Sequence, residues 1–208
     1  MKPINWLLGF LALVLIATGA GVFIWSGAYN IAADNPHWPL TERLMSTLRD
    51  RSIAAQASDV VVPALDDDSL IRTGAGNYDA MCVGCHLKPG VERSEVSAGL
   101  YPPPPNLTRR RTDDPARAFW VIKHGIKMSG MPAWGKSMED EHIWGMVAFL
   151  RQLSDLSPEL YRQLVAASGG HSHGGQEDRS HNDGEEPAAA QEEVAKPRSH
   201  DDAPPHDH

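Results

Sequence analysis

The amino-acid sequence predicts an all-α protein in which a small helical domain lies between an apolar N-terminal helix and a charged C-terminal tail. Three observations support this prediction. The N-terminus is one long apolar run, residues 66–165 show helical periodicity interrupted by loops rich in Gly and Pro, and residues 166–208 show no apolar periodicity. We therefore predict a transmembrane helix in residues 1–26, a linker in residues 27–65, a helical domain and a disordered tail.

The apolar run at the N-terminus has the length of a membrane-spanning helix. Residues 1–30 contain a single charged side chain, Lys2, and about 20 apolar residues suffice to cross a bilayer core of roughly 30 Å. A cleaved signal peptide is the alternative, because residues 18–20 are small enough for a cleavage site. The run continues to Trp25, which is long for a signal-peptide core, so an uncleaved anchor is favoured. The positive-inside tendency would keep Lys2 in the cytoplasm and export the chain after Gly27.

The linker contains one amphipathic segment, residues 37–57. Thr41 is the predicted N-cap of a helix, and four side chains are expected to share one face of it: Leu44, Met45, Leu48 and Ala55. Such a helix could lie on a membrane surface, pack on the following domain, or serve only as a spacer.

The formal charge of −8 is concentrated in the tail. The net charges of residues 1–65, 66–165 and 166–208 are 0, −1 and −7. No basic patch of the kind that binds nucleic acid is present, so nucleic acid is excluded as a partner.

Three helices are expected in the domain, over residues 67–82, 113–125 and 138–153, the last with Asp140 as its N-cap. A glycine inside a helix, such as Gly74, costs on the order of 1 kcal/mol relative to alanine. This cost is explained if another helix approaches closely at that point. The predicted partner is the third helix.

The only two cysteines lie three positions apart, as Cys82 and Cys85, and His86 follows at once. CxxCH is the signature of covalent haem c attachment. On a helical turn the two sulfurs project to one side and can form thioethers with the vinyl groups of one porphyrin, and the adjacent imidazole can bind the iron. The sequence therefore predicts one haem c, attached to both cysteines and ligated by His86.

Other uses of paired cysteines fit less well. A zinc site would need two further ligands, and the available His124 and His142 show no paired ligand spacing. A thioredoxin-like dithiol requires a preceding strand, and none is predicted. A structural disulfide does not account for the histidine.

The second axial ligand of the iron would come from Met128 or Met131. Met131 is favoured because Pro132 disposes it to an extended backbone, and because Trp134 and Gly135 could close a loop over the ring. Most methionines fill the core, but the upstream CxxCH makes a ligand role the better interpretation here. Met128 remains the alternative ligand.

Several motifs in residues 67–153 occur together. They are the Gly74 and Tyr78 helix, the CxxCH, the Pro105-Asn106-Leu107 stretch, the Met131-Pro132 pair and a final helix with Trp144. In this combination the segment resembles a class I, mono-haem cytochrome c. The resemblance implies the cytochrome c fold, with the Gly74 and Tyr78 face crossing the final helix near Trp144. It also implies that the carbonyl of Pro105 accepts a hydrogen bond from His86, although the run of four prolines, Pro102–Pro105, departs from the usual single one.

The resemblance further implies electron transfer. With both axial positions filled by protein, no substrate reaches the iron, so an enzyme is not expected. Together with the anchor, this predicts a single-pass protein of a bacterial cytoplasmic membrane with its haem domain in the periplasm. The expected redox partners are a quinol-oxidising complex, a dehydrogenase or a terminal oxidase. A haem-based gas sensor is an alternative if Met131 leaves the iron readily.

Two charged segments have open roles. The basic run Arg109–Arg111 could pair with a haem propionate or an acidic partner, or could be a solvated loop. The tail contains six histidines: His171, His173, His181, His200, His206 and His208. Those in the HSH and HDH pairs, His171, His173, His206 and His208, could bind copper, nickel or zinc. Metal handling is therefore a second alternative function. The other interpretation of the tail is that it only keeps the protein soluble.

Overall fold

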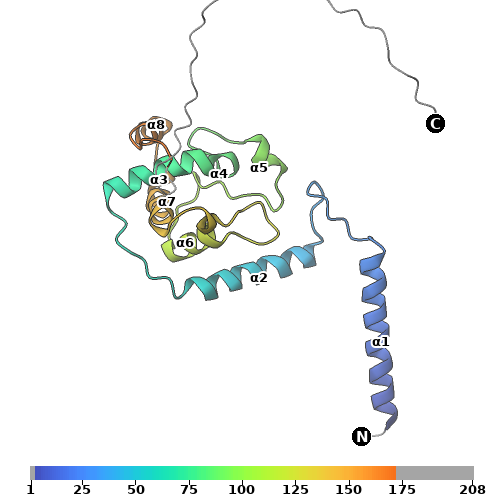
Figure 1. Cartoon of the computed structure of the whole chain (residues 1–208). Coiled ribbons are helices and arrows are strands. Elements are labelled where there is room, and N and C mark those ends of the chain that lie inside the picture. Colours follow the sequence, from blue (N-terminus) through green and yellow to red (C-terminus); the bar gives the residue numbers. More distant parts are fainter. Residues whose placement is uncertain (1–2, 172–208) are drawn as a thin grey trace, which may run out of the picture. The chain divides into compact units, whose positions relative to one another are not determined.

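The computed structural model describes residues 3–171 of the 208-residue chain, and in this part all regular elements are helical (Figure 1). They are α1 Pro3–Trp25, α2 Pro39–Ala57, α3 Asp68–Met81, α4 Val83–His86, α5 Glu95–Gly99, α6 Pro115–His124, a 3-10 turn η1 Trp134–Lys136, α7 Asp140–Leu153 and α8 Pro158–Ala166. The all-α prediction is confirmed. Residues 172–208 of the predicted tail, with five of its six histidines, lie outside the described residues.

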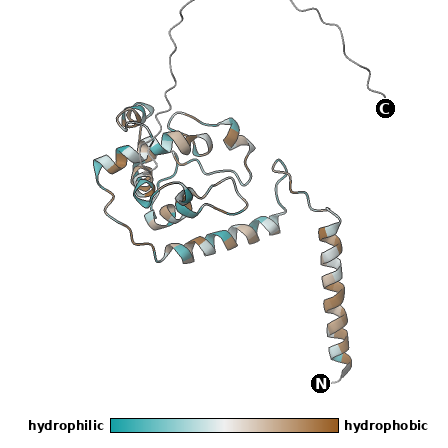
Figure 2. Cartoon of the chain, in the orientation of Figure 1, coloured by the Kyte–Doolittle hydropathy of each residue, from teal (hydrophilic) through white to brown (hydrophobic). Residues whose placement is uncertain are grey.

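Helix α1 is apolar along nearly its whole length (Figure 2). Its mean hydropathy over Ile4–Trp25 is 2.5. At about 1.5 Å per residue the helix is roughly 34 Å long, which exceeds the roughly 30 Å of a bilayer's hydrocarbon core. Its length and composition fit a single-pass membrane anchor.

The core of the domain forms where α3 crosses α7 (Figure 1). Gly74 and Gly145 face each other at the crossing, and a Cβ atom on Gly74 would overlap the carbonyl oxygen of Gly145. The predicted partner of the Gly74 helix is therefore correct, and the glycine is required because the two backbones touch. Around this point the largest fully buried side chains are Tyr78, Phe149, Ile143, Met146, Leu153 and Val147.

Local capping sets the ends of the domain helices. The Asp67 carboxylate accepts hydrogen bonds from the first turn of α3, and the Asp114 carboxylate does the same for α6. Helix α6 ends at His124, and the next residue, Gly125, has a φ of 65° that suits a residue without a Cβ atom. The N-cap of α7 is Glu139, one residue before the predicted Asp140. Asp140 lies in the first turn, where its negative charge interacts favourably with the positive end of the helix dipole.

Helix α2 differs from its prediction in start and in surroundings. It begins at Pro39, with Trp38 as N-cap, because Pro is well suited to the first helical turn. The predicted N-cap at Thr41 is therefore wrong. The helix packs on α6, with Ile53 and Ala57 buried. It is therefore part of the domain rather than a spacer.

The apolar side chains of α2 do not all lie on the face that packs. Leu40, Leu44 and Leu48 are exposed, at 78%, 64% and 61%. Met45, by contrast, lines the central cavity of the domain. The predicted common face is thus divided: its leucines are exposed to solvent, and Met45 lines the cavity.

Helix α8 has no counterpart in the sequence prediction. Tyr161 in this helix is 2% exposed, and its hydroxyl donates to the Asp79 carboxylate on α3 at 2.8 Å. The Ser157-Pro158-Glu159 start was a usable signal, because the Ser157 hydroxyl caps the helix by accepting from the Leu160 N–H.

Candidate haem site

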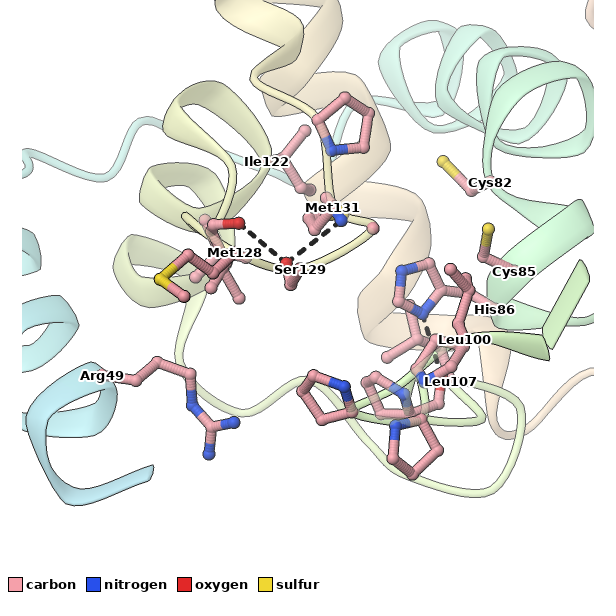
Figure 3. Close-up of a pocket in the computed structure, with 18 of the residues that line it drawn as sticks. Arg49, Cys82, Cys85, His86, Leu100, Leu107, Ile122, Met128, Ser129 and Met131 are labelled. Carbon is pink, nitrogen blue, oxygen red and sulfur yellow. Dashed lines mark hydrogen bonds between the residues drawn. The ribbon is translucent and has the colours of Figure 1, made fainter. Parts of the chain in front are cut away.

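The CxxCH segment forms a tight helical turn at the end of α3. The carbonyl of Cys82 accepts hydrogen bonds from the N–H groups of Cys85 at 3.1 Å and His86 at 2.8 Å. Cys82, Cys85 and His86 all line one cavity (Figure 3). Both cysteines are free thiols, so the structure contains no disulfide between them.

The imidazole of His86 is oriented by the proline loop. Its Nδ1–H donates to the carbonyl oxygen of Pro105 at 2.9 Å (Figure 3), and the Leu107 N–H donates to the carbonyl of His86 at 3.3 Å. Because Nδ1 is engaged, Nε2 is the nitrogen left for a metal. Burial lowers the pKa of His86 and the bond to Pro105 opposes that shift. Burial therefore favours the neutral imidazole that ligates metals.

A buried tyrosine holds the chain immediately after His86. The hydroxyl of Tyr78 donates to the carbonyl of Leu87 at 2.7 Å, where the backbone takes a φ of 68°. Burial raises the pKa of Tyr78, so it stays a neutral donor at physiological pH. This bond connects the α3–α7 core directly to the CxxCH turn.

The chemistry of the thiols argues against a redox or zinc site. Burial, with a smaller contribution from Cys85, raises the pKa of Cys82 to about 12, whereas a dithiol redox site depends on a lowered thiol pKa. Neither His124 nor His142 lines the cavity, so the two candidate zinc ligands are not brought to the cysteines.

Met131 lies on the opposite wall of the cavity from Cys85 and His86 (Figure 3). Its loop folds back on Gly125: the Ile126 N–H donates to the Met131 carbonyl at 3.2 Å, and the Met131 N–H donates to the Ser129 hydroxyl at 3.2 Å. Met131 also packs on the hydrophobic core. Met128 lines the same cavity, but its side chain is 87% exposed.

The cavity has a volume of about 440 Å³, within the range of pockets that hold small organic ligands. Two thiols and an imidazole face a thioether across it, and the prolines of Pro102–Pro105 and apolar side chains of α6 form much of the remaining lining. This donor set in an apolar cavity fits haem c, whose attachment uses thiols and whose iron takes His and Met ligands.

Helix α2 supplies lining residues that the sequence did not predict. Five residues line the cavity from α2 and the segment before it: His37, Glu42, Met45, Ser46 and Arg49. The helical spacing of Glu42, Met45 and Arg49, at intervals of three and four residues, was the available signal. Arg109, Arg110 and Arg111, in contrast, do not line the cavity. Arg109 pairs with Glu92, and Arg111 lies 3.5 Å from Asp113 and 3.6 Å from Asp155.

Comparison with known proteins gives one match, in the central part of the chain. Residues 69–150 match the family model described as cytochrome C oxidase, cbb3-type, subunit III. The match covers 82 of the 208 residues and leaves α1, α2 and α8 outside it. No curated protein and no solved structure matches the chain.

Proposed function

We propose that the protein is a membrane-anchored carrier of single electrons, because residues 69–150 match a family model of c-type cytochromes. Bound haem c supplies a one-electron iron couple. The observation that carries the proposal is the meeting of two free thiols, a histidine with its Nδ1 engaged, and a methionine on opposite walls of one cavity.

In this proposal Cys82 and Cys85 attach the haem and His86 is an axial ligand. The turn that joins α3 to α4 holds the three side chains on one side, and the Pro105 carbonyl fixes the ring of His86. Such outer contacts orient a metal ligand and raise its basicity. The chain contains one CxxCH, so a single haem is expected.

Met131 is the proposed second axial ligand. Its partial burial and hydrogen-bonded loop hold it on the cavity wall, whereas the exposed Met128 is held less firmly. With Met131 in place, the protein would fill both axial positions and exclude small molecules from the iron. That arrangement supports electron transfer and argues against a gas sensor.

The anchor and the partners complete the proposal. Helix α1 would hold the protein in a bacterial cytoplasmic membrane by a single span, with the haem domain in the periplasm. A quinol-oxidising complex or a dehydrogenase would donate electrons. The description of the matching family favours a terminal oxidase as the acceptor.

Visible spectroscopy tests the haem part of the proposal. The full chain, produced in a host with c-type maturation and purified in detergent, should show a c-type reduced spectrum that carbon monoxide does not change. A prompt change with carbon monoxide would contradict a closed site. Extraction of the haem from the wild-type protein by acidic acetone would contradict thioether attachment. The Cys82→Ser, Cys85→Ser double variant is the control, because it should carry no covalently attached haem.

Two further measurements test the anchor. The intact mass of the purified protein should include residues 1–26, since cleavage at a signal-peptide site would shorten the chain. Alkaline carbonate should leave the protein in the membrane fraction. Release by carbonate would contradict a transmembrane helix.

A further inference from the structure

Helix α2 forms one wall of the cavity although it lies outside the residues matched to the c-type family. Glu42, Ser46 and Arg49 follow one another at intervals of four and three residues, so they share the face of α2 that lines the cavity. The other face carries the exposed Leu40, Leu44 and Leu48. A ligand in the cavity would therefore meet polar side chains on the α2 wall.

The covalent chemistry of haem c determines where such a group would be. The thioethers form at one edge of the porphyrin, and the two propionate carboxylates extend from the opposite edge. Attachment at Cys82 and Cys85 therefore directs the carboxylates away from α4. Figure 3 shows Arg49 extending from α2 on the side of the cavity across from both cysteines.

The guanidinium of Arg49 is held by Asp50, which also pairs with Arg117. Its Nε–H donates to the Asp50 carboxylate at 3.1 Å, and the same carboxylate accepts from Nη2 of Arg117 on α6 at 3.1 Å. Hydrogen bonds from both arginines lower the pKa of Asp50, so its negative charge persists at physiological pH. Within residues 3–171 the two terminal nitrogens of Arg49 have no hydrogen-bond or ion-pair partner.

The other ionisable groups on the cavity wall do not replace Arg49. Besides the cysteines and His86, they are His37, Glu42, Tyr101 and Lys127. The Tyr101 hydroxyl already accepts a hydrogen bond from the His37 N–H at 3.1 Å, and a phenol supplies no positive charge. Glu42 is negative and would repel a carboxylate, and the side chain of Lys127 is exposed. His37 is committed at Nδ1 to the hydroxyl of Tyr29, 2.8 Å away.

We propose that Arg49 binds a propionate of haem c through its terminal nitrogens, which makes α2 a working part of the haem site. The inference rests on the proposed function, because it requires the haem. An arginine is suited to the role, since its planar fork binds a carboxylate through two hydrogen bonds.

The proposal predicts the sign of an electrochemical effect. A cation beside a propionate cancels part of its negative charge and so favours ferrous over ferric iron. Removing the cation lowers the reduction potential. It also raises the pKa of the propionate, so the potential should vary more with pH across about pH 5 to 8.

The test is an optical redox titration of the full-length, haem-loaded protein over that pH range. Arg49→Gln should lower the potential and increase its dependence on pH, with an unchanged spectrum. Arg49→Lys, which keeps the charge but lacks the fork, should recover part of the shift. Arg51→Gln is the matched control, because this exposed arginine is on the same helix and does not line the cavity.

A second variant distinguishes the effect of the Arg49 guanidinium on the reduction potential from the effect of docking α2 on α6. Arg117→Gln removes the ion pair between α2 and α6 but leaves Arg49 in place, so its shift should be the smaller. An equal shift in Arg117→Gln or in Arg51→Gln would overturn the proposal, as would an unchanged potential in Arg49→Gln. Absence of covalent haem from the wild-type protein would instead contradict the proposed function.

Discussion

Gly74 of α3 and Gly145 of α7 bring two helix backbones into direct contact. A Cβ atom on Gly74 would overlap the carbonyl oxygen of Gly145, and a Cβ atom on Gly145 would lie 3.0 Å from the carbonyl oxygen of Leu70. The contact matters for the haem site because α3 continues into Cys82. The crossing therefore determines where the CxxCH turn lies relative to the core.

Gly74→Ala should destabilise the domain. The added methyl group meets a backbone atom that cannot move aside, so a loss of about 3 kcal/mol or more is expected, even though alanine favours the helix by about 1 kcal/mol. Denaturant unfolding followed by circular dichroism measures the change. Gly99→Ala is the control, because a Cβ atom there meets nothing within 4 Å, and a similar loss in both variants would contradict the steric explanation.

Met131→Ala should open the second axial position. We expect carbon monoxide to bind the reduced protein and the reduction potential to fall, because a thioether ligand raises the potential. Spectra with and without carbon monoxide, together with a redox titration, measure both effects. Met128→Ala should leave both unchanged, and the reverse result would assign the ligand to Met128.

Gly125→Ala should displace the Met131 loop without releasing the haem. Gly125 has a φ of 65°, and a Cβ atom on it would lie 2.7 Å from the carbonyl oxygen of Met131. We expect a fraction of the protein to bind carbon monoxide while all of the haem stays covalently attached. Gly169→Ala introduces the same kind of backbone strain, at a φ of 75°, with nothing within 4 Å. If both variants bind carbon monoxide equally, the contact with Met131 is not the cause.

The docking of α2 on α6 should weaken in acid. The pKa of Asp50 is lowered in the folded protein from its usual 3.8, first by its hydrogen bond from Arg49 and also by Arg117. Arg49 lies beside Asp50 on α2 in either state, so only the part of the lowering due to Arg117 of α6 is lost on undocking, and to that extent the undocked helix binds the proton more tightly. The contribution of Asp50 is therefore present above about pH 4 and is lost as the pH falls through the lowered value.

Hydrogen exchange of the α2 amides at a series of pH values measures this effect. Asp50→Asn should exchange faster than wild type near neutral pH and should converge with it in acid. Since the Asp50 side chain is 51% exposed, the difference should be small. Parallel profiles for the two proteins would show that Asp50 does not control docking.

The sequence by itself determined the features that depend on residues close together in the chain. Cys82, Cys85 and His86 lie within one helical turn, so their shared direction follows from local geometry. The ends of α6 also follow from local chemistry, because Asp114 caps its start and Gly125 permits the backbone that ends it. Gly74 also indicated a close crossing with the helix over residues 138–153, which the structure confirms.

Only the tertiary structure decided which distant residues surround the cavity. Periodicity divides α2 into faces but does not say what each face meets, and the face toward the cavity carries Arg49 while three leucines remain exposed. Similarly, Met128 and Met131 are too close in sequence for spacing to separate them. The return of the loop onto Gly125 half-buries Met131 and leaves Met128 exposed. The physical reason is that packing between elements depends on the whole set of neighbours, whereas helix turns and caps depend on a few adjacent residues.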